Sequence, residues 1–123
     1  MELKTATAAL AALAHEGRLA TFRLLVQAGP GGVAAGEIAR RLGVLPNSLS
    51  ANLNLLSHAG LISSRREGRS IIYTADYDGM TALLGFLVQD CCGASSEICA
   101  PLYETLVRSA CCPPDATPMR ETA

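Results

Sequence analysis

Residues 35–75 read AGEIARRLGVLPNSLSANLNLLSHAGLISSRREGRSIIYTA, where two short helical patterns are followed by two strand patterns. We predict a first helix over residues 35–42, which ends at Gly43, a residue suited to a left-handed cap. A second helix is predicted over residues 46–58, since Pro46 is tolerated in the first turn of a helix and Gly60 closes it. Two helices joined by so short a link have the form of a helix-turn-helix.

A predicted β-hairpin follows this pair directly. Residues 61–65 and 70–75 are short β-forming runs, and the turn between them contains Gly68. A hairpin in this position is a wing. Three further stretches carry apolar side chains at helical spacing and are predicted as helices, namely residues 3–14, 18–27 and 78–89. The expected fold class is therefore mainly α with a small β-hairpin, a winged helix-turn-helix.

The length of 123 residues corresponds to one ordinary domain, and half of the residues are hydrophobic. We expect residues 1–90 to form a DNA-binding and dimerisation domain and residues 91–123 to form a cysteine-containing effector segment with a mobile tail. The longest nearly apolar run, residues 80–88, is well short of the roughly 20 residues of a membrane span. No export signal is recognisable, so we expect a cytoplasmic protein without membrane contact.

Charge is distributed unevenly along the chain, although the net charge is only −1. Residues 17–72 contain seven arginines and two glutamates, a balance of +5, whereas residues 73–123 contain two arginines and seven acids, a balance of −5. Local field governs the attraction of phosphate groups. The basic middle of the chain is therefore compatible with binding of nucleic acid.

The second predicted helix has an apolar side and a polar side. If Leu49, Leu53 and Leu56 face the core, the opposite face carries amide, hydroxyl and methyl groups. Such groups contact base edges and phosphates in a major groove. Arginines of the hairpin are placed for phosphates or the minor groove. The predicted DNA-binding residues are Asn47, Ser48, Ser50, Ala51, Asn54, Arg65, Arg66 and Arg69.

Four pieces of sequence occur here in combination: SLSANLNLL at residues 48–56, AGLI at 59–62, REGR at 66–69, and Tyr73. Together with the amphipathic helix before them, they resemble the ArsR/SmtB family of metal- and metalloid-responsive winged-helix repressors. The resemblance covers about residues 5–90. It implies a homodimer that pairs through the first and last long helices and binds a pseudo-palindromic operator in double-stranded DNA.

The chain departs from the family pattern within the second helix of the pair. Family members often carry a basic or histidine residue where this sequence has Ala51 and Asn52. The predicted recognition helix is therefore uncharged, and we expect its affinity for DNA to depend on the wing and on contacts from the helix ends.

Five cysteines, Cys91, Cys92, Cys99, Cys111 and Cys112, lie within a stretch of 22 residues near the C-terminal end. In a cytosolic protein this clustering favours ligand binding or redox chemistry over structural disulfides. The spacing lacks the paired half-sites of a closed zinc site. The two histidines are distant in sequence, and we interpret His15 as a helix-junction residue and His58 as a solvated or capping residue at a helix end.

A soft centre that binds only thiolates suits this cysteine pattern better than zinc does. Trivalent arsenic takes three sulfurs in a pyramid and needs no fourth ligand. Cys91 and Cys92 stand at the expected end of the last long helix, and the chain after Gly93 is long enough to fold back and deliver Cys99. Cys111 and Cys112 could form a second dithiol site, complete the first site, or be idle.

Arsenic-responsive family members of the commonest type place their cysteines in the first helix of the helix-turn-helix, where this chain has none. The site resembles that of other arsenic-responsive members, which carry a vicinal cysteine pair at the end of the dimer helix. We therefore expect Cys91, Cys92 and Cys99 to bind As(III) as an effector, not as a catalytic cofactor. Antimony(III) or another thiophilic ion is the alternative ligand.

The hypothesis from sequence is thus a dimeric transcriptional repressor that arsenite releases from its operator by re-ordering the dimer helix. Alternatives are the same scaffold sensing methylarsenite, antimony, cadmium, lead or mercury, a thiol redox switch, or a winged helix that binds protein instead of DNA. Redox sensing is disfavoured by the acidic neighbours Asp90 and Glu97. No C-x-x-C on a βαβ pattern and no nucleophile–base pair is recognisable, so we do not expect an enzyme.

Overall fold

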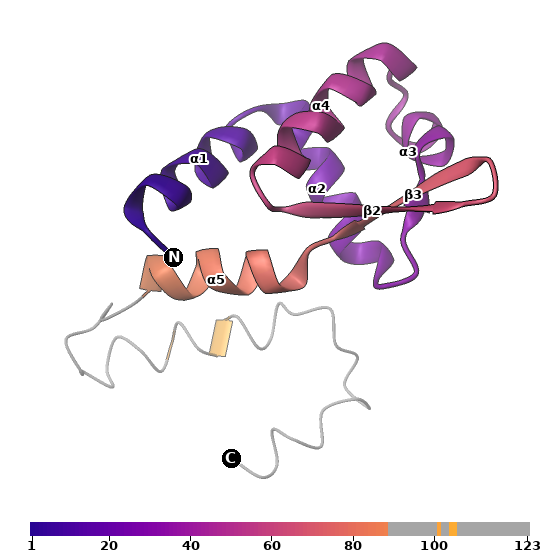
Figure 1. The fold of residues 1–123 in the computed structure, drawn as a ribbon. Helices are drawn as coiled ribbons and strands as arrows, with labels where there is room; N and C mark the ends of the chain where they lie inside the picture. Colours follow the sequence, from indigo (N-terminus) through magenta and orange to yellow (C-terminus); the bar gives the residue numbers. More distant parts are fainter. Residues whose placement is uncertain (89–100, 102–103, 106–123) are drawn as a thin grey trace, which may run out of the picture. The chain divides into compact units, whose positions relative to one another are not determined.

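The computed structural model describes residues 1–88, 101, 104 and 105. Its elements follow in the order α1 (Leu3–Leu13), α2 (Glu16–Ala28), β1 (Val33–Ala34), α3 (Ala35–Leu42), α4 (Pro46–His58), β2 (Ile62–Glu67), β3 (Ser70–Ala75) and α5 (Tyr77–Val88) (Figure 1). The predicted mainly α fold with a β-hairpin after two short helices is confirmed. The bounds of α3 and α4 coincide with those predicted.

Residues Met1–Leu87 form one compact unit. The predicted boundary at residue 90 and all five cysteines lie outside the described residues, as does most of the predicted effector segment. No helix within the described residues is long and apolar enough to cross a membrane.

The sheet contains one strand more than the sequence predicts. Its order is β1-β3-β2, with both pairs antiparallel, and the hairpin closes at the pair Glu67 and Ser70. The additional strand, β1, places Val33 opposite Tyr73 on the free edge of β3. A strand of two residues is too short to show the alternation of apolar and polar side chains, so the sequence did not predict it.

Gly32 permits the loop before β1 to approach β3. Its φ of +78° lies in the left-handed region. A Cβ atom at this position would lie 2.6 Å from a methyl carbon of Ile72 and 2.7 Å from the carbonyl oxygen of Tyr73. Only glycine therefore fits at this edge of the sheet.

The core is built from aliphatic side chains of several elements. Those with almost no exposed surface include Leu25 of α2, Ile38 of α3, and Leu61 at the entry to β2. The predicted seam of α4, formed by Leu49, Leu53 and Leu56, is fully buried among them. The recognition helix is therefore fixed by its apolar side, which leaves the opposite side free for contacts with other molecules.

The first turn of α5 is held against α2 and against the chain that follows α4. The backbone N–H of Asp76 donates to the carbonyl of Leu61 at 2.8 Å, and the Asp76 carboxylate accepts from the backbone N–H of Gly79 at 2.9 Å. The Tyr77 hydroxyl donates to the carbonyl of Val26 at 3.0 Å. Gly79 also packs so closely on the carbonyl of Gly60 that a Cβ atom would overlap its oxygen. These contacts fix where α5 begins.

We predict that Gly79→Ala destabilises the protein by about 1–3 kcal/mol, because the methyl group must displace backbone and not a flexible side chain. The matched control is Gly36→Ala in α3, where an added Cβ meets nothing within 4 Å. That change is expected to be neutral or to stabilise the protein by up to about 1 kcal/mol. Urea unfolding of both variants measures the difference, and equal stabilities would show that α5 tolerates displacement at this point.

Candidate nucleic-acid interface

The link between α3 and α4 is set by Gly43. This residue adopts the left-handed conformation, with φ 67° and ψ 35°, and caps α3 by donating its N–H to the carbonyl of Ala39. The left-handed cap expected from the sequence is confirmed. The chain then runs through Val44 and Leu45 into Pro46, the first residue of α4. The result is a helix-turn-helix with α4 in the position of the recognition helix.

The outward side of α4 is polar and carries no acidic or basic group apart from the terminal His58. The predicted base-reading residues are all exposed, namely Asn47, Ser48, Ser50, Ala51 and Asn54. Asn52 is different, because it is half-buried and its amide nitrogen would lie 3.3 Å from a Cβ placed on Gly17 of α2. Asn52 thus belongs to the packing of α4 on α2, so the departure from the family pattern affects the exposed face only at Ala51.

Arg65 of β2 forms hydrogen bonds within the wing and to the loop before β1. Its Nε donates to a carboxylate oxygen of Glu67 at 2.7 Å, and one terminal nitrogen donates to the carbonyl of Gly31 at 2.8 Å. The first contact joins residues two apart on one face of the strand, and the second ties the hairpin to the loop before β1. The sequence did not indicate this role, since Gly31 lies 34 residues away.

Arg66 and Arg69 are the wing's unpaired cations. Both side chains are exposed, and neither takes part in a hydrogen bond or ion pair among the residues that the structure describes. Arg66 is the fifth residue of β2, and Arg69 forms the two-residue turn with Gly68. Their guanidinium groups are therefore available for phosphate oxygens, which guanidinium binds in bidentate geometry.

The arginines of α3 are partly neutralised within the protein. Glu37 pairs with Arg40, and it also accepts from Arg41 Nε at 2.8 Å. These exposed pairs contribute little stability, but they lower the field of α3 at the surface. Of the balance of +5 in residues 17–72, the wing carries +2, with three arginines against one glutamate, Arg18 and Arg23 of α2 carry another +2, and α3 carries +1.

The two histidines occupy helix ends. His15 is the N-cap of α2, and its Nδ1 accepts from the backbone N–H groups of Gly17 at 3.1 Å and Arg18 at 3.3 Å. The prediction of a helix-junction residue is confirmed. His58 is exposed at the end of α4, as expected of a solvated residue. Within residues 1–88, 101, 104 and 105, no group of three or more His, Cys, Asp and Glu side chains is suited to a metal ion.

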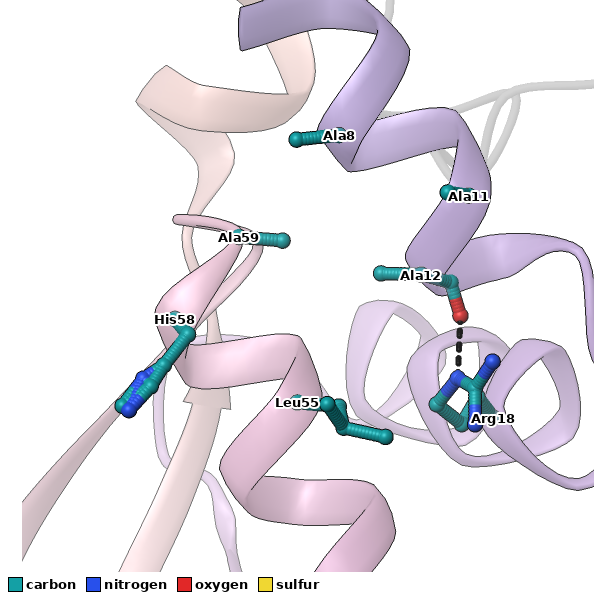
Figure 2. A pocket seen from close by; sticks show the side chains of 7 residues that line it. All are labelled: Ala8, Ala11, Ala12, Arg18, Leu55, His58 and Ala59. Atoms are coloured by element: carbon teal, nitrogen blue, oxygen red, sulfur yellow. Dashed lines mark hydrogen bonds between the residues drawn. The ribbon is translucent and has the colours of Figure 1, made fainter.

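His58 also borders an open groove of about 370 Å³ between α1 and α4. Figure 2 shows the side chains around it, with the Arg18 guanidinium donating from Nε to the carbonyl of Ala12 at 2.6 Å. The groove is mostly apolar, and its lining residues are Ala8, Ala11, Ala12, Arg18, Leu55, His58 and Ala59. None of them is one of the predicted base-reading residues of α4, so the groove is separate from the candidate DNA-reading surface.

Comparison with known proteins agrees with this geometry. The helix-turn-helix domain family matches residues 13–65. The HTH-type transcriptional regulator YgaV of Escherichia coli is 32% identical over 82 residues, which cover 67% of this chain and 81% of that protein.

Solved structures give the same result. The homodimeric winged helix-turn-helix DNA-binding domain of a possible ArsR-family regulator from Mycobacterium bovis is 32% identical, with a TM-score of 0.58, over 72% of this chain and 82% of that one. A possible transcriptional regulator for arsenical resistance is 26% identical, with a TM-score of 0.56, over 63% of this chain and 78% of that one.

The fold, the exposed face of α4 and the wing thus define a winged helix-turn-helix transcription regulator, a DNA-binding protein and not an enzyme. More specifically, the chain belongs to the ArsR family of transcriptional regulators.

We predict that Arg66→Ala and Arg69→Ala each weaken binding to duplex DNA of any sequence, because each removes an exposed guanidinium group from the wing that we expect to contact phosphates. Each change is expected to reduce the slope of log affinity against log salt by about 1. Lys4→Ala, which removes an exposed cation of α1, is the matched control and is expected to leave the slope unchanged. Fluorescence anisotropy over a series of salt concentrations measures these slopes, and unchanged slopes for the wing variants would exclude the wing from the interface.

Proposed function

We propose that the protein is a dimeric repressor that holds a two-fold related operator and releases it when arsenite binds Cys91, Cys92 and Cys99. The observation that carries the DNA-binding half is the exposed, uncharged polar face of α4 together with the exposed Arg66 and Arg69 of the wing, which make no ion pair among the described residues. In this docking α4 enters the major groove, and Arg66 and Arg69 contact phosphates or the minor groove.

Exposed leucines support pairing of two chains through α1 and α5. Leu3 and Leu10 of α1 and Leu84 and Leu87 of α5 are all more than 40% exposed in the single chain. Burial of such side chains between two copies is favourable in water. The M. bovis relative is homodimeric. A two-fold dimer would present two copies of α4 to successive turns of the major groove.

Thiolate chemistry supports trivalent arsenic as the effector. Arsenous acid can exchange its three hydroxyl groups for three cysteine sulfurs, and each departing hydroxide takes one thiol proton and leaves as water. The oxidation state of arsenic does not change, so no reductant is required. The described part of α5 extends to Val88, three residues before Cys91 in the sequence. A structural relative is described as a possible regulator for arsenical resistance, which favours arsenic among the soft thiophiles.

The contacts at the start of α5 offer a route from effector to operator. Asp76 and Gly79 tie the first turn of α5 to Leu61 and Gly60, which directly follow the recognition helix. In our proposal arsenic re-orders the far end of α5, and the two copies of α4 then lose their matched spacing. The effector must bind the DNA-free arrangement more tightly than the bound one, because only differential affinity shifts an equilibrium.

Titration of operator release with arsenite tests this proposal. We expect the full-length protein to lose its affinity for operator DNA in a gel-shift assay, and Cys91→Ser, Cys92→Ser and Cys99→Ser each to retain it. Cys111→Ser and Cys112→Ser decide whether those thiols form a second or auxiliary site. Operator affinity that arsenite leaves unchanged would contradict arsenic sensing.

The same variants separate the alternative effectors. Methylarsenite needs only two thiols, so its response should survive in Cys99→Ser, whereas the arsenite response should not. Antimony(III), cadmium, lead and mercury are titrated in parallel with the same cysteine variants. Release by hydrogen peroxide that a thiol reductant reverses would indicate a redox switch instead.

A further inference from the structure

Leu45 is unusually placed for a large apolar residue. It lies in the turn between α3 and α4 and is 73% exposed, a value matched among the large hydrophobic residues that the structure describes only by Leu3 near the N-terminus, at 72%. Its neighbour Val44 is also exposed. The turn of the helix-turn-helix therefore ends in an apolar tip.

The fold does not account for Leu45. It is the N-cap of α4, in extended conformation, and its side chain makes no capping hydrogen bond. Ser, Thr, Asp and Asn are strongly preferred at this position, and Leu is among the poor caps. Because Leu45 neither packs in the core nor caps the helix, its side chain is free to serve a contact with another molecule.

The position of Leu45 identifies that contact. Residues at the start of a recognition helix approach base edges, and Leu45 is followed by Pro46 and the exposed Asn47 and Ser48. The α4 helix carries no arginine or lysine that could form a bidentate contact with guanine. The apolar group that a base edge presents in the major groove is the C5-methyl of thymine, and apolar side chains contact it.

We propose that Leu45 is a specificity-determining residue that reads the C5-methyl group of one thymine in each operator half-site. This inference rests on the proposed operator binding and adds to it a particular residue and a particular chemical group on the DNA. Asn47 and Ser48 beside it supply hydrogen bonds, whereas Leu45 discriminates by apolar contact alone.

Replacement of thymine by deoxyuridine tests the inference, since it removes only the methyl group. Duplexes are first selected from a random pool with the full-length protein, and each thymine of the selected site is then replaced in turn. We expect one position per half-site at which the replacement weakens binding by about fourfold, the effect of one buried methyl group. At that position Leu45→Ala should bind the thymine and deoxyuridine duplexes equally.

Two further variants keep the test specific. Leu55→Ala also removes an exposed leucine of α4, but Leu55 lines the groove beside α1 (Figure 2), so discrimination of thymine should remain. Leu45→Ser supplies a favourable helix cap and should fold at least as stably as the wild type, yet lose the discrimination. Thermal unfolding of each variant verifies the fold.

The outcomes distinguish this inference from the proposed function. If no duplex is enriched or bound specifically, operator binding is wrong and the role of Leu45 is overturned with it. If a duplex is bound specifically but every deoxyuridine replacement affects wild type and Leu45→Ala alike, only the role of Leu45 is overturned.

Discussion

The backbone of Gly79 rests on the carbonyl of Gly60, and the arrangement of the functional elements depends on this contact. Gly60 has a φ of +78° and turns the chain from α4 towards the sheet. Leu61, the next residue, is buried, and its carbonyl accepts the hydrogen bond of Asp76. The recognition helix, the wing and α5 thus meet within a few residues, so none can shift there without affecting the others.

Charged and uncharged groups of the candidate DNA-binding surface lie on different elements. Glu37 and Glu67 pair with the arginines of α3 and with one arginine of the wing, while Arg66 and Arg69 have no such partner among the residues that the structure describes. The α4 helix itself offers amides, hydroxyls and a methyl group on its exposed side. Affinity for phosphates is therefore expected from the wing, and discrimination among bases from uncharged groups of α4 and the turn before it.

Local signals made most of the fold predictable. Gly43, Pro46 and Gly60 mark helix ends for reasons of backbone geometry, so the bounds of α3 and α4 were predicted correctly. The outward face of α4 followed from the burial of its leucines at helical spacing. The sequence did not predict β1, because a strand of two residues is too short to show alternation of apolar and polar side chains. It did not predict the hydrogen bond from Arg65 to the carbonyl of Gly31, because this bond joins distant parts of the chain. The thiolate site remains a prediction, since its cysteines lie outside the described residues.

The central claim is that α4 and the wing form the DNA-binding surface. The most direct test is NMR of the ¹⁵N-labelled protein, titrated with a duplex that was selected from a random pool for binding to it. The account predicts that amide signals of residues 47–54 and 66–69 shift on addition of DNA. Signals of residues such as Ala8 and Ala11 on α1, beside the groove, should shift much less. Shifts concentrated on α1 and absent from α4 and the wing would contradict the account.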